Sequence, residues 1–200
     1  LDKAAGLRGN DQDFYHIPVA GHTKHSEERI MNMVKVCPPH EAIHREHVLD
    51  PTILEGFQPS EWGPSYANHP AVLNNRGPVV PFALYLDAAQ YLKKDSVIVF
   101  VLCDLLSGSR HLAAILRKKD LCKCGCRGFC SLRPALDMLR WSIAALAAGR
   151  FPATDHSGKP WGAADEHRAS LAGLPMAVSG AVVQVKGDWA EFSSSLFFPT

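Results

Sequence analysis

The feature that most constrains the fold is the run SVIVFVLCDLL at residues 96–106, which is rich in β-branched residues and has few polar ones on either face. Such a run is typical of a central strand that is covered on both sides of its sheet. Two further strand-like runs flank it, VVPFALYLDAAQY at 79–91 and RHLAAILRK at 110–118. The sequence therefore predicts three consecutive strands.

A helix and a fourth strand follow in the pattern. Residues 132–148 place leucine and isoleucine side chains on one helical stripe that ends at Gly149, a common helix stop. AVVQVKGD at 181–188 predicts another buried strand, and WAEFSSSL at 189–196 predicts the start of a second helix. The order strand, strand, strand, helix, strand, helix is that of ribonuclease-H-like nucleases, so we expect an α/β domain with a mixed sheet over 79–200.

Residues 1–78 lack this regularity, and we expect an irregular N-terminal arm with one or two helices. Ser26 is a suitable N-cap, and Ile30, Met33 and Val34 fall at helical spacing, which predicts a helix over 26–36. A second short helix is expected to begin at Pro38 or the following proline. The cysteine-rich stretch 119–131 is interpreted as a loop insertion in the main domain.

Composition bounds the class of protein. Two hundred residues with 46% hydrophobic content suffice for one sizeable core. We find neither a secretory leader nor a run of about 18 apolar residues, so we expect a protein that is neither secreted nor membrane-spanning. Four of the six cysteines lie within nine residues, which favours a metal cluster or a reducing compartment, and so the cytoplasm or the nucleus.

Positive charge is concentrated in residues 107–150, which contain nine lysines and arginines and two aspartates. The formal charge of the whole chain is only +1. A face that binds a polyanion such as DNA is one interpretation. The alternative is an ordinary solvated surface. The candidate nucleic-acid contacts are Arg117, Lys118, Lys119, Lys123 and Arg127.

Two aspartates fall where predicted strands end. Asp87 closes the first strand and Asp188 the fourth, and in a ribonuclease-H-like order these strands bring two carboxylates to one centre. Carboxylate oxygens suit Mg²⁺ or Mn²⁺, and two such ions about 4 Å apart can activate a water and stabilise a leaving 3′ oxygen. An aspartate at a strand end also serves commonly as a turn former or helix cap.

The four clustered cysteines, Cys122, Cys124, Cys126 and Cys130, could hold one Zn²⁺ as thiolates. Their CxCxCxxxC spacing differs from the usual pair of distant CxxC knuckles and requires one loop to wrap around the metal. Either Cys103 or His111 could replace one ligand. The alternative is a set of reduced thiols, made reactive by nearby lysine and arginine.

A second metal motif is the HExxH sequence His40-Glu41-Ala42-Ile43-His44. In zinc hydrolases the two histidines bind the metal and the glutamate is the general base. A third ligand has no motif to support it, although Glu55 and Glu61 are candidates. The alternative is a solvated, histidine-rich helix.

Three segments carry a family resemblance: HPAVLNNRGPVVPFALYLDAAQY, RHLAAILRKKDLCKCGCRGFC and VVQVKGDWAEF. They resemble a family of proteins of unknown function from protist genomes that are crowded with mobile elements. More distantly, Asp87 and the pair Gly187-Asp188 resemble CACTA and Plavaka DDE transposases. The resemblance implies metal-dependent cleavage and transfer of DNA strands, with the two aspartates as metal ligands.

Two departures limit what the resemblance implies. Ala88 stands where those relatives commonly have glycine after the first acid, and the chain stops 12 residues past Asp188, before the expected third acid. Glu191 is a poor substitute for that acid. We therefore expect a fragment that lacks its C-terminal part, or a decayed copy, with little activity alone. A homo-oligomer is one possible state of the protein. The alternative functions are a non-catalytic, zinc-stabilised nucleic-acid-binding remnant and an HExxH zinc hydrolase.

Overall fold

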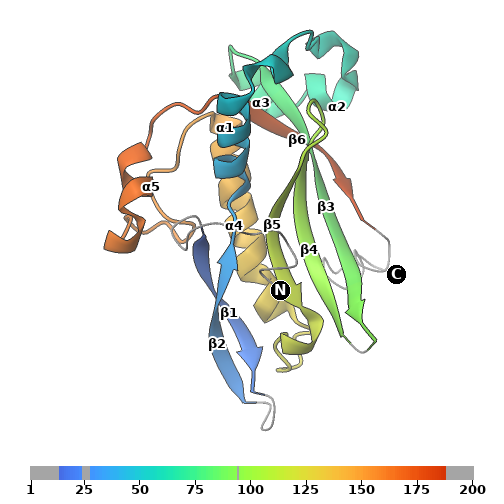
Figure 1. Ribbon diagram of the computed structural model, residues 1–200, viewed down its shortest axis with the longest axis vertical. Helices are drawn as coiled ribbons and strands as arrows, with labels where there is room; N and C mark the ends of the chain where they lie inside the picture. The colour runs from blue at the N-terminus through green and yellow to red at the C-terminus, as the bar shows by residue number, and fades with distance from the viewer. Residues whose placement is uncertain (1–13, 24–27, 94, 188–200) are drawn as a thin grey trace.

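The computed structural model describes residues 14–23, 28–93 and 95–187 (Figure 1). The helices and strands are, in chain order, β1 (Tyr15–His22), β2 (Arg29–Val36), α1 (Pro39–Leu49), α2 (Gly63–Ala67), α3 (Pro70–Asn74), β3 (Val79–Leu92), β4 (Asp95–Asp104), β5 (Arg110–Arg117), α4 (Phe129–Ala148), α5 (Glu166–Leu171) and β6 (Ser179–Lys186). Short 3-10 helices lie between them: η2 (Pro51–Leu54), η3 (Pro59–Glu61), η4 (Lys118–Asp120) and η5 (Ala163–Asp165).

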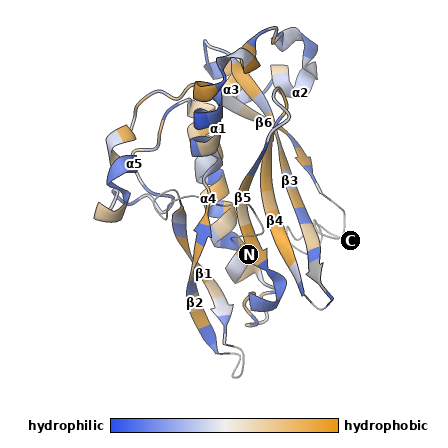
Figure 2. Ribbon diagram, in the orientation of Figure 1, coloured by the Kyte–Doolittle hydropathy of each residue, from blue (hydrophilic) through white to orange (hydrophobic). Residues whose placement is uncertain are grey.

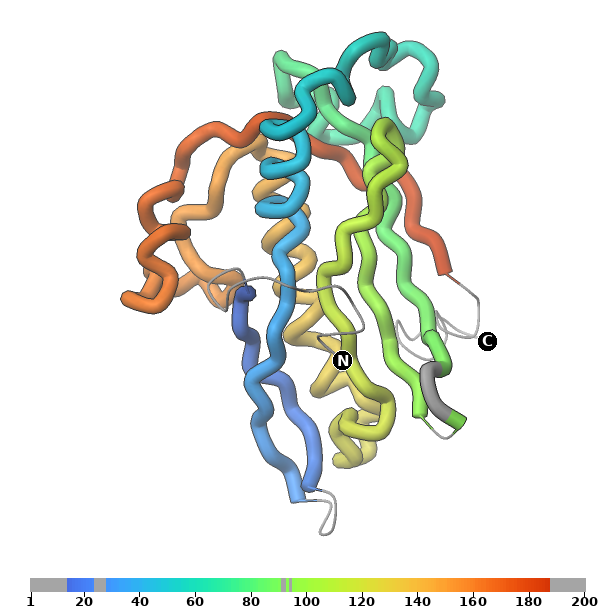
Figure 3. Tube along the Cα trace, viewed as in Figure 1, coloured from blue at the N-terminus to red at the C-terminus, as the bar shows by residue number. Residues whose placement is uncertain are grey.

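The main sheet is mixed and has the strand order β5-β4-β3-β6. The pairs β3–β4 and β4–β5 are antiparallel, whereas β6 runs parallel to β3 and places Lys186 beside Tyr85. Figure 3 follows the chain from α4 through the excursion that carries α5 and back to β6. The three consecutive strands, the helix and the fourth strand of the predicted α/β domain are confirmed; the predicted helix at 189–196 lies outside the described residues.

The two faces of this sheet differ. On one face, Phe82 and Leu86 of β3 pack into the apolar cores beneath α4 and α1. Figure 2 shows that hydrophobic residues make up much of β3 and β4. Because side chains alternate along a strand, Tyr85 and Asp87 lie on the opposite face, where α2 and α3 cover one end. β4 is central as predicted, but its residues alternate between buried and half-buried, so the expectation of full cover on both faces is wrong for the described chain.

Helix α4 begins at Phe129, three residues before the predicted start, and ends at Gly149 as predicted. Gly128 and Gly149 flank it with φ of 84° and 63°, values that suit glycine because it lacks a Cβ. Along the predicted stripe Leu132, Leu139 and Leu146 are buried and join the two cores on the α4 face of the sheet.

The helix predicted over 26–36 is wrong in its described part, because residues 29–36 form β2 and pair antiparallel with β1. The spacing of Ile30, Met33 and Val34 suits a helix, but pairing with β1 sets a period of two instead. Met33 consequently points outward and is 63% exposed. In β1 the apolar residues Tyr15, Ile17 and Val19 recur at every second position and are buried, a strand signal that the sequence reading missed.

The described part of residues 1–78 shares the cores of the sheet. Ile17 and Val36 of the hairpin pack with residues of α4 and β4, and Ile43 of α1 packs with residues of β3. α1 begins at Pro39, as predicted. Buried His47 on α1 also bonds buried Asp104, at 2.8 Å between Nε2 and Oδ2, which ties α1 to the turn after β4.

Candidate metal centre

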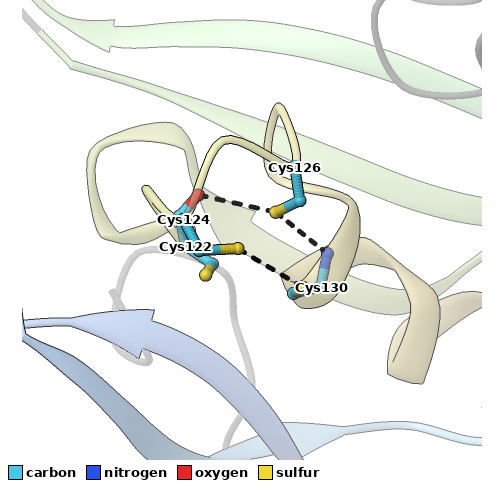
Figure 4. A group of neighbouring side chains, drawn as sticks. All are labelled: Cys122, Cys124, Cys126 and Cys130. Atoms are coloured by element: carbon cyan, nitrogen blue, oxygen red, sulfur yellow. Dashed lines mark hydrogen bonds between the residues drawn. The ribbon is translucent and has the colours of Figure 1, made fainter.

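The cysteine loop connects η4 with α4 and contains Cys122, Cys124, Cys126 and Cys130. Its backbone turns back on itself through three left-handed residues, Gly125 at φ 86°, Arg127 at φ 53° and Gly128 at φ 84°. Two of these are glycines, which adopt that conformation without the steric cost of a Cβ. The glycines between the cysteines thus allow one short segment to present four sulfurs to a common point (Figure 4).

The sulfur atoms of these four cysteines lie within 4.8 Å of one another. The sulfurs of Cys124 and Cys130 are 3.7 Å apart. Tetrahedral zinc with Zn–S bonds of about 2.3 Å requires neighbouring sulfurs about 3.8 Å apart. The four cysteines could therefore hold a metal such as zinc with little change in the positions of the side chains.

Hydrogen bonds within the loop favour a thiolate at Cys126. The backbone N–H of Cys130, at the start of α4, donates to the Cys126 sulfur at 3.5 Å and lowers the pKa of that thiol to about 6. Hydrogen bonding of the Cys130 thiol with the Cys126 side chain, and then with Cys124, raises the pKa of Cys130 to about 12. The loop thus holds one ready thiolate, and the others must lose protons when a metal binds.

The loop is anchored to the N-terminal hairpin through Ser131. This buried hydroxyl accepts a hydrogen bond from the N–H of Cys122 at 2.8 Å and donates one to the carbonyl of Ala20 on β1. The Nδ1 atom of His22 lies 2.9 Å from the carbonyl oxygen of Leu121. Residues about 100 positions apart in sequence therefore hold the base of the loop in place.

The two substitute ligands considered from sequence do not join the group. Among described residues the cluster consists of the four loop cysteines alone. His111 is instead held by Glu46, with 2.7 Å between Nε2 and Oε2, and Cys103 lies on β4.

The predicted nucleic-acid contacts differ in how deeply they are buried. Arg117 and Lys119 both bind the buried carboxylate of Asp95, at 2.8 Å and 2.9 Å. Part of their charge is therefore used within the protein. Lys118 is half-buried, whereas Lys123 and Arg127 are exposed on the cysteine loop.

Asp87 does not end its strand as predicted, because β3 continues to Leu92 and pairs Asp87 with Val99. Its carboxylate is half-buried, and it accepts hydrogen bonds from the Tyr85 hydroxyl at 2.7 Å and from the N–H of Ala88 at 2.8 Å. Asp188 lies outside the described residues. The predicted pairing of Asp87 with Asp188 therefore stays a prediction, and β3 and β6 are neighbours in the sheet.

The HExxH residues lie on α1, but each is used by a different contact. The buried ring of His40 bonds the Ser142 hydroxyl through Nδ1 at 2.9 Å, and burial lowers the pKa of His40 to about 3. Glu41 accepts two hydrogen bonds from Arg168, at 2.6 Å and 3.0 Å. The would-be general base is thus engaged by a guanidinium.

His44 gives a sharper argument against zinc at this motif. Its Nδ1 accepts a hydrogen bond from the N–H of Ala177 at 3.0 Å. A neutral imidazole with an unprotonated Nδ1 carries its proton on Nε2, so Nε2 is a donor and not a metal ligand. No described residue completes a metal-binding group with His40 and His44, Glu55 and Glu61 included.

The face of α1 that carries HExxH lines a cavity of about 430 Å³ with Phe151, Trp161 and Arg168. Arg168 is only 5% exposed and also bonds Asp165 at 2.7 Å. The sequence reading missed Ser131, Ser142 and Arg168 as positioning residues. No short motif marks them, because each has a partner more than 100 positions away in the chain: Ala20 for Ser131, His40 for Ser142 and Glu41 for Arg168.

Comparison with protein-family models, with curated proteins and with solved structures finds no match to this chain. The family resemblance therefore stays a prediction. Within the described ranges, none of the helices is long and apolar enough to cross a membrane.

Proposed function

We propose that the chain is a ribonuclease-H-like domain that acts on DNA by metal-dependent phosphodiester cleavage and strand transfer, as in DDE transposases. The observation that supports this best is the parallel pairing of β6 with β3 on the side opposite β4. Lys186 pairs with Tyr85, and Asp188 and Asp87 each follow two positions later in sequence. In a ribonuclease-H-like domain this strand order brings two such acids to one centre, which supports the proposal.

Asp87 has the chemistry that such a site needs. Each of its oxygens accepts one hydrogen bond, and a carboxylate has about four lone-pair sites, so capacity for a cation is left. Hard oxygen ligands of this kind suit Mg²⁺ or Mn²⁺. When bound, such ions would supply electrostatic stabilisation as water attacks phosphorus and the bond to the 3′ oxygen breaks. Asp87 and Asp188 would hold them.

Zinc in the cysteine loop has a structural role in this proposal. It would fix the loop that carries Lys123 and Arg127, so that these exposed cations meet the DNA backbone in a defined position. Action on DNA agrees with the predicted nuclear or cytoplasmic location.

The proposal is tested by titrating Mn²⁺ into the zinc-loaded chain and measuring free Mn²⁺ by electron paramagnetic resonance. Asp87→Asn and Asp188→Asn should each weaken Mn²⁺ binding by at least about tenfold, because each removes a ligand. Asp50→Asn, which alters an exposed acid that caps Thr52, is the matched control. Equal binding by all four proteins would refute the shared metal site.

A second candidate is a non-catalytic, zinc-stabilised domain that binds nucleic acid. It is favoured by one observation, that the cysteines form the sole group of three or more potential metal ligands in the described ranges. This candidate predicts DNA binding that requires zinc, with no specific Mn²⁺ site at Asp87. The same titration separates the two functions.

A further inference from the structure

Beside the cysteine loop lies a groove of about 420 Å³ that the sequence did not indicate. It is lined by Pro18 and Arg29 of the hairpin, by Phe129, Arg133 and Asp137 of α4, and by His156. We call it the arginine groove, and we propose that it binds one nucleotide of a single-stranded nucleic acid. The proposal rests on the proposed action on DNA and adds a contact site to it.

The charge of the groove favours an anion. Arg29 is exposed on β2, and Arg133 is 68% exposed on α4. Asp137 lies 3.5 Å from Arg133, but an exposed pair of this kind is worth at most about 1 kcal/mol and does not hold the guanidinium away from a phosphate. The exposed cations Lys123 and Arg127 on the neighbouring loop add to the same positive field.

His156 contributes a neutral donor to the groove. The Tyr15 hydroxyl accepts a hydrogen bond from the N–H of His156 at 3.3 Å, so its own proton points to Nδ1 of the same residue at 2.6 Å. The neutral ring then carries its proton on Nε2. Burial lowers the pKa of His156, which keeps the ring neutral near pH 7. The groove thus combines two guanidinium groups, one N–H donor and one carboxylate.

Phe129 distinguishes a nucleotide from other anions. The ring is 38% exposed at the first position of α4, beside Arg133, although aromatic side chains are usually covered. Bases stack on such rings, and the contact is worth about 1–3 kcal/mol per base. A duplex already stacks its bases internally, so an exposed ring flanked by cations fits a single strand. The volume is within the range of about 300–1,000 Å³ that is usual for ligand sites.

The test is the fluorescence anisotropy of a labelled oligothymidylate of about 15 nucleotides, titrated with the zinc-loaded chain. Phe129→Leu, which keeps an apolar side chain, should weaken binding about tenfold, and Phe129→Tyr should restore it. The double variant Arg29→Glu with Arg133→Glu should weaken binding more than tenfold. Arg133→Gln with Arg29→Gln should also flatten the dependence of log K on log salt by about 1.4, the value for two phosphate contacts with a single strand.

The matched control is Arg76→Glu with Arg140→Glu, which makes the same charge change at exposed sites outside the groove. It should change affinity less than about twofold beyond the effect of net charge. Equal weakening by the control and the groove variant, or insensitivity to Phe129→Leu, would overturn the proposal. So would competition by polyglutamate that matches oligothymidylate at equal charge, since the groove would then bind an acidic peptide. Far-ultraviolet circular dichroism confirms that each variant is folded.

Failure of this proposal is distinguishable from failure of the proposed function. The anisotropy titration contains no Mn²⁺, so it reports on the groove without the metal site at Asp87, which lies on the sheet face opposite α4. If the chain binds oligothymidylate but shows no specific Mn²⁺ site at Asp87, strand cleavage is refuted and the groove proposal stands. Intact Mn²⁺ binding, with no effect of the groove variants on oligothymidylate binding, would refute the groove and keep the proposed function.

Discussion

The cysteine loop and helix α1 both present potential zinc ligands at short spacing, yet they differ in what their ligand atoms contact. In the loop the four sulfurs face one another within 4.8 Å. In α1 the ring of His44 is turned by the amide of Ala177, and Glu41 is bound by Arg168. A motif names the residue types, whereas the hydrogen bonds of each ligand atom decide whether that atom is available to a metal. HExxH is the better known signature, and it is the one whose side chains already contact other partners.

The strongest test of this contrast is zinc stoichiometry. Cys126→Ser with Cys130→Ser should reduce zinc from one ion per chain to none under conditions where His40→Ala with His44→Ala keeps it, because only the first pair removes ligands. We expect a loss of affinity beyond the about 100-fold that follows loss of an outer-shell partner. Inductively coupled plasma mass spectrometry of the dialysed proteins measures this. Loss of zinc from the histidine variant instead would reverse the comparison.

The engagement of Glu41 can be tested by Arg168→Leu. Removing a nearly buried guanidinium leaves two carboxylates, Glu41 and Asp165, without their partner, which should cost about 3 kcal/mol in the free energy of unfolding. Urea denaturation with zinc present measures it. Lys159→Leu, on an exposed loop position, serves as control and should cost less than about 0.5 kcal/mol. A second bound zinc in Arg168→Leu would show that the ion pair alone had kept metal from α1.

The backbone of the cysteine loop offers a smaller effect. Gly128→Ala should destabilise by about 1–2 kcal/mol, because alanine is unfavourable at a φ of 84° and its Cβ would lie 3.0 Å from Leu121. Gly158→Ala, at a φ of 81° with nothing within 4 Å, shares the conformational cost without the contact. The difference between their unfolding midpoints therefore measures the effect of the contact between the added Cβ and Leu121. Equal midpoints would mean that the Leu121 side chain moves to accommodate the added Cβ without a cost in stability.

The smallest expected effect concerns the order of thiol reactivity in the zinc-free chain. Since the folded pKa of Cys126 is about 6, below its ordinary value, its thiolate persists at neutral pH and is lost as the pH falls through 6. Cys130, with a pKa of about 12, should react with iodoacetamide at pH 7 more slowly than Cys126. Peptide mass spectrometry of partly alkylated protein reads the order. Faster labelling of Cys130 than of Cys126 would contradict the hydrogen-bond directions in the loop.

The sequence predicts those elements whose pattern is set locally. β3, β4, β5 and α4 follow from continuous apolar runs and from one helical stripe. β2 does not, because Ile30 and Val34 fit a helix as well as a strand and the pairing with β1 decides. A pattern read one segment at a time fails where pairing with another strand, even the neighbouring one, sets the period.

The same limit applies to the candidate sites. The cysteines could be grouped from sequence because four ligands lie within nine residues. The contacts of His40 with Ser142 and of Glu41 with Arg168 join residues more than 100 positions apart, and nothing in either local segment announces them. Asp95, which draws Arg117 and Lys119 inward, likewise reads as an ordinary turn residue.

Ser131 couples the stability of the cysteine loop to that of the N-terminal hairpin. Its hydroxyl accepts a hydrogen bond from the amide of Cys122 and donates one to the carbonyl of Ala20, so the loop and the hairpin are joined through one buried side chain. The coupling between two binding events is reciprocal. If zinc binding stabilises the docking of β1, then docked β1 raises the affinity of the loop for zinc by the same free energy. Amide exchange at β1 would then vary with the concentration of free zinc. Exchange of the β1 amides would therefore report zinc binding at a loop about a hundred residues later in the chain.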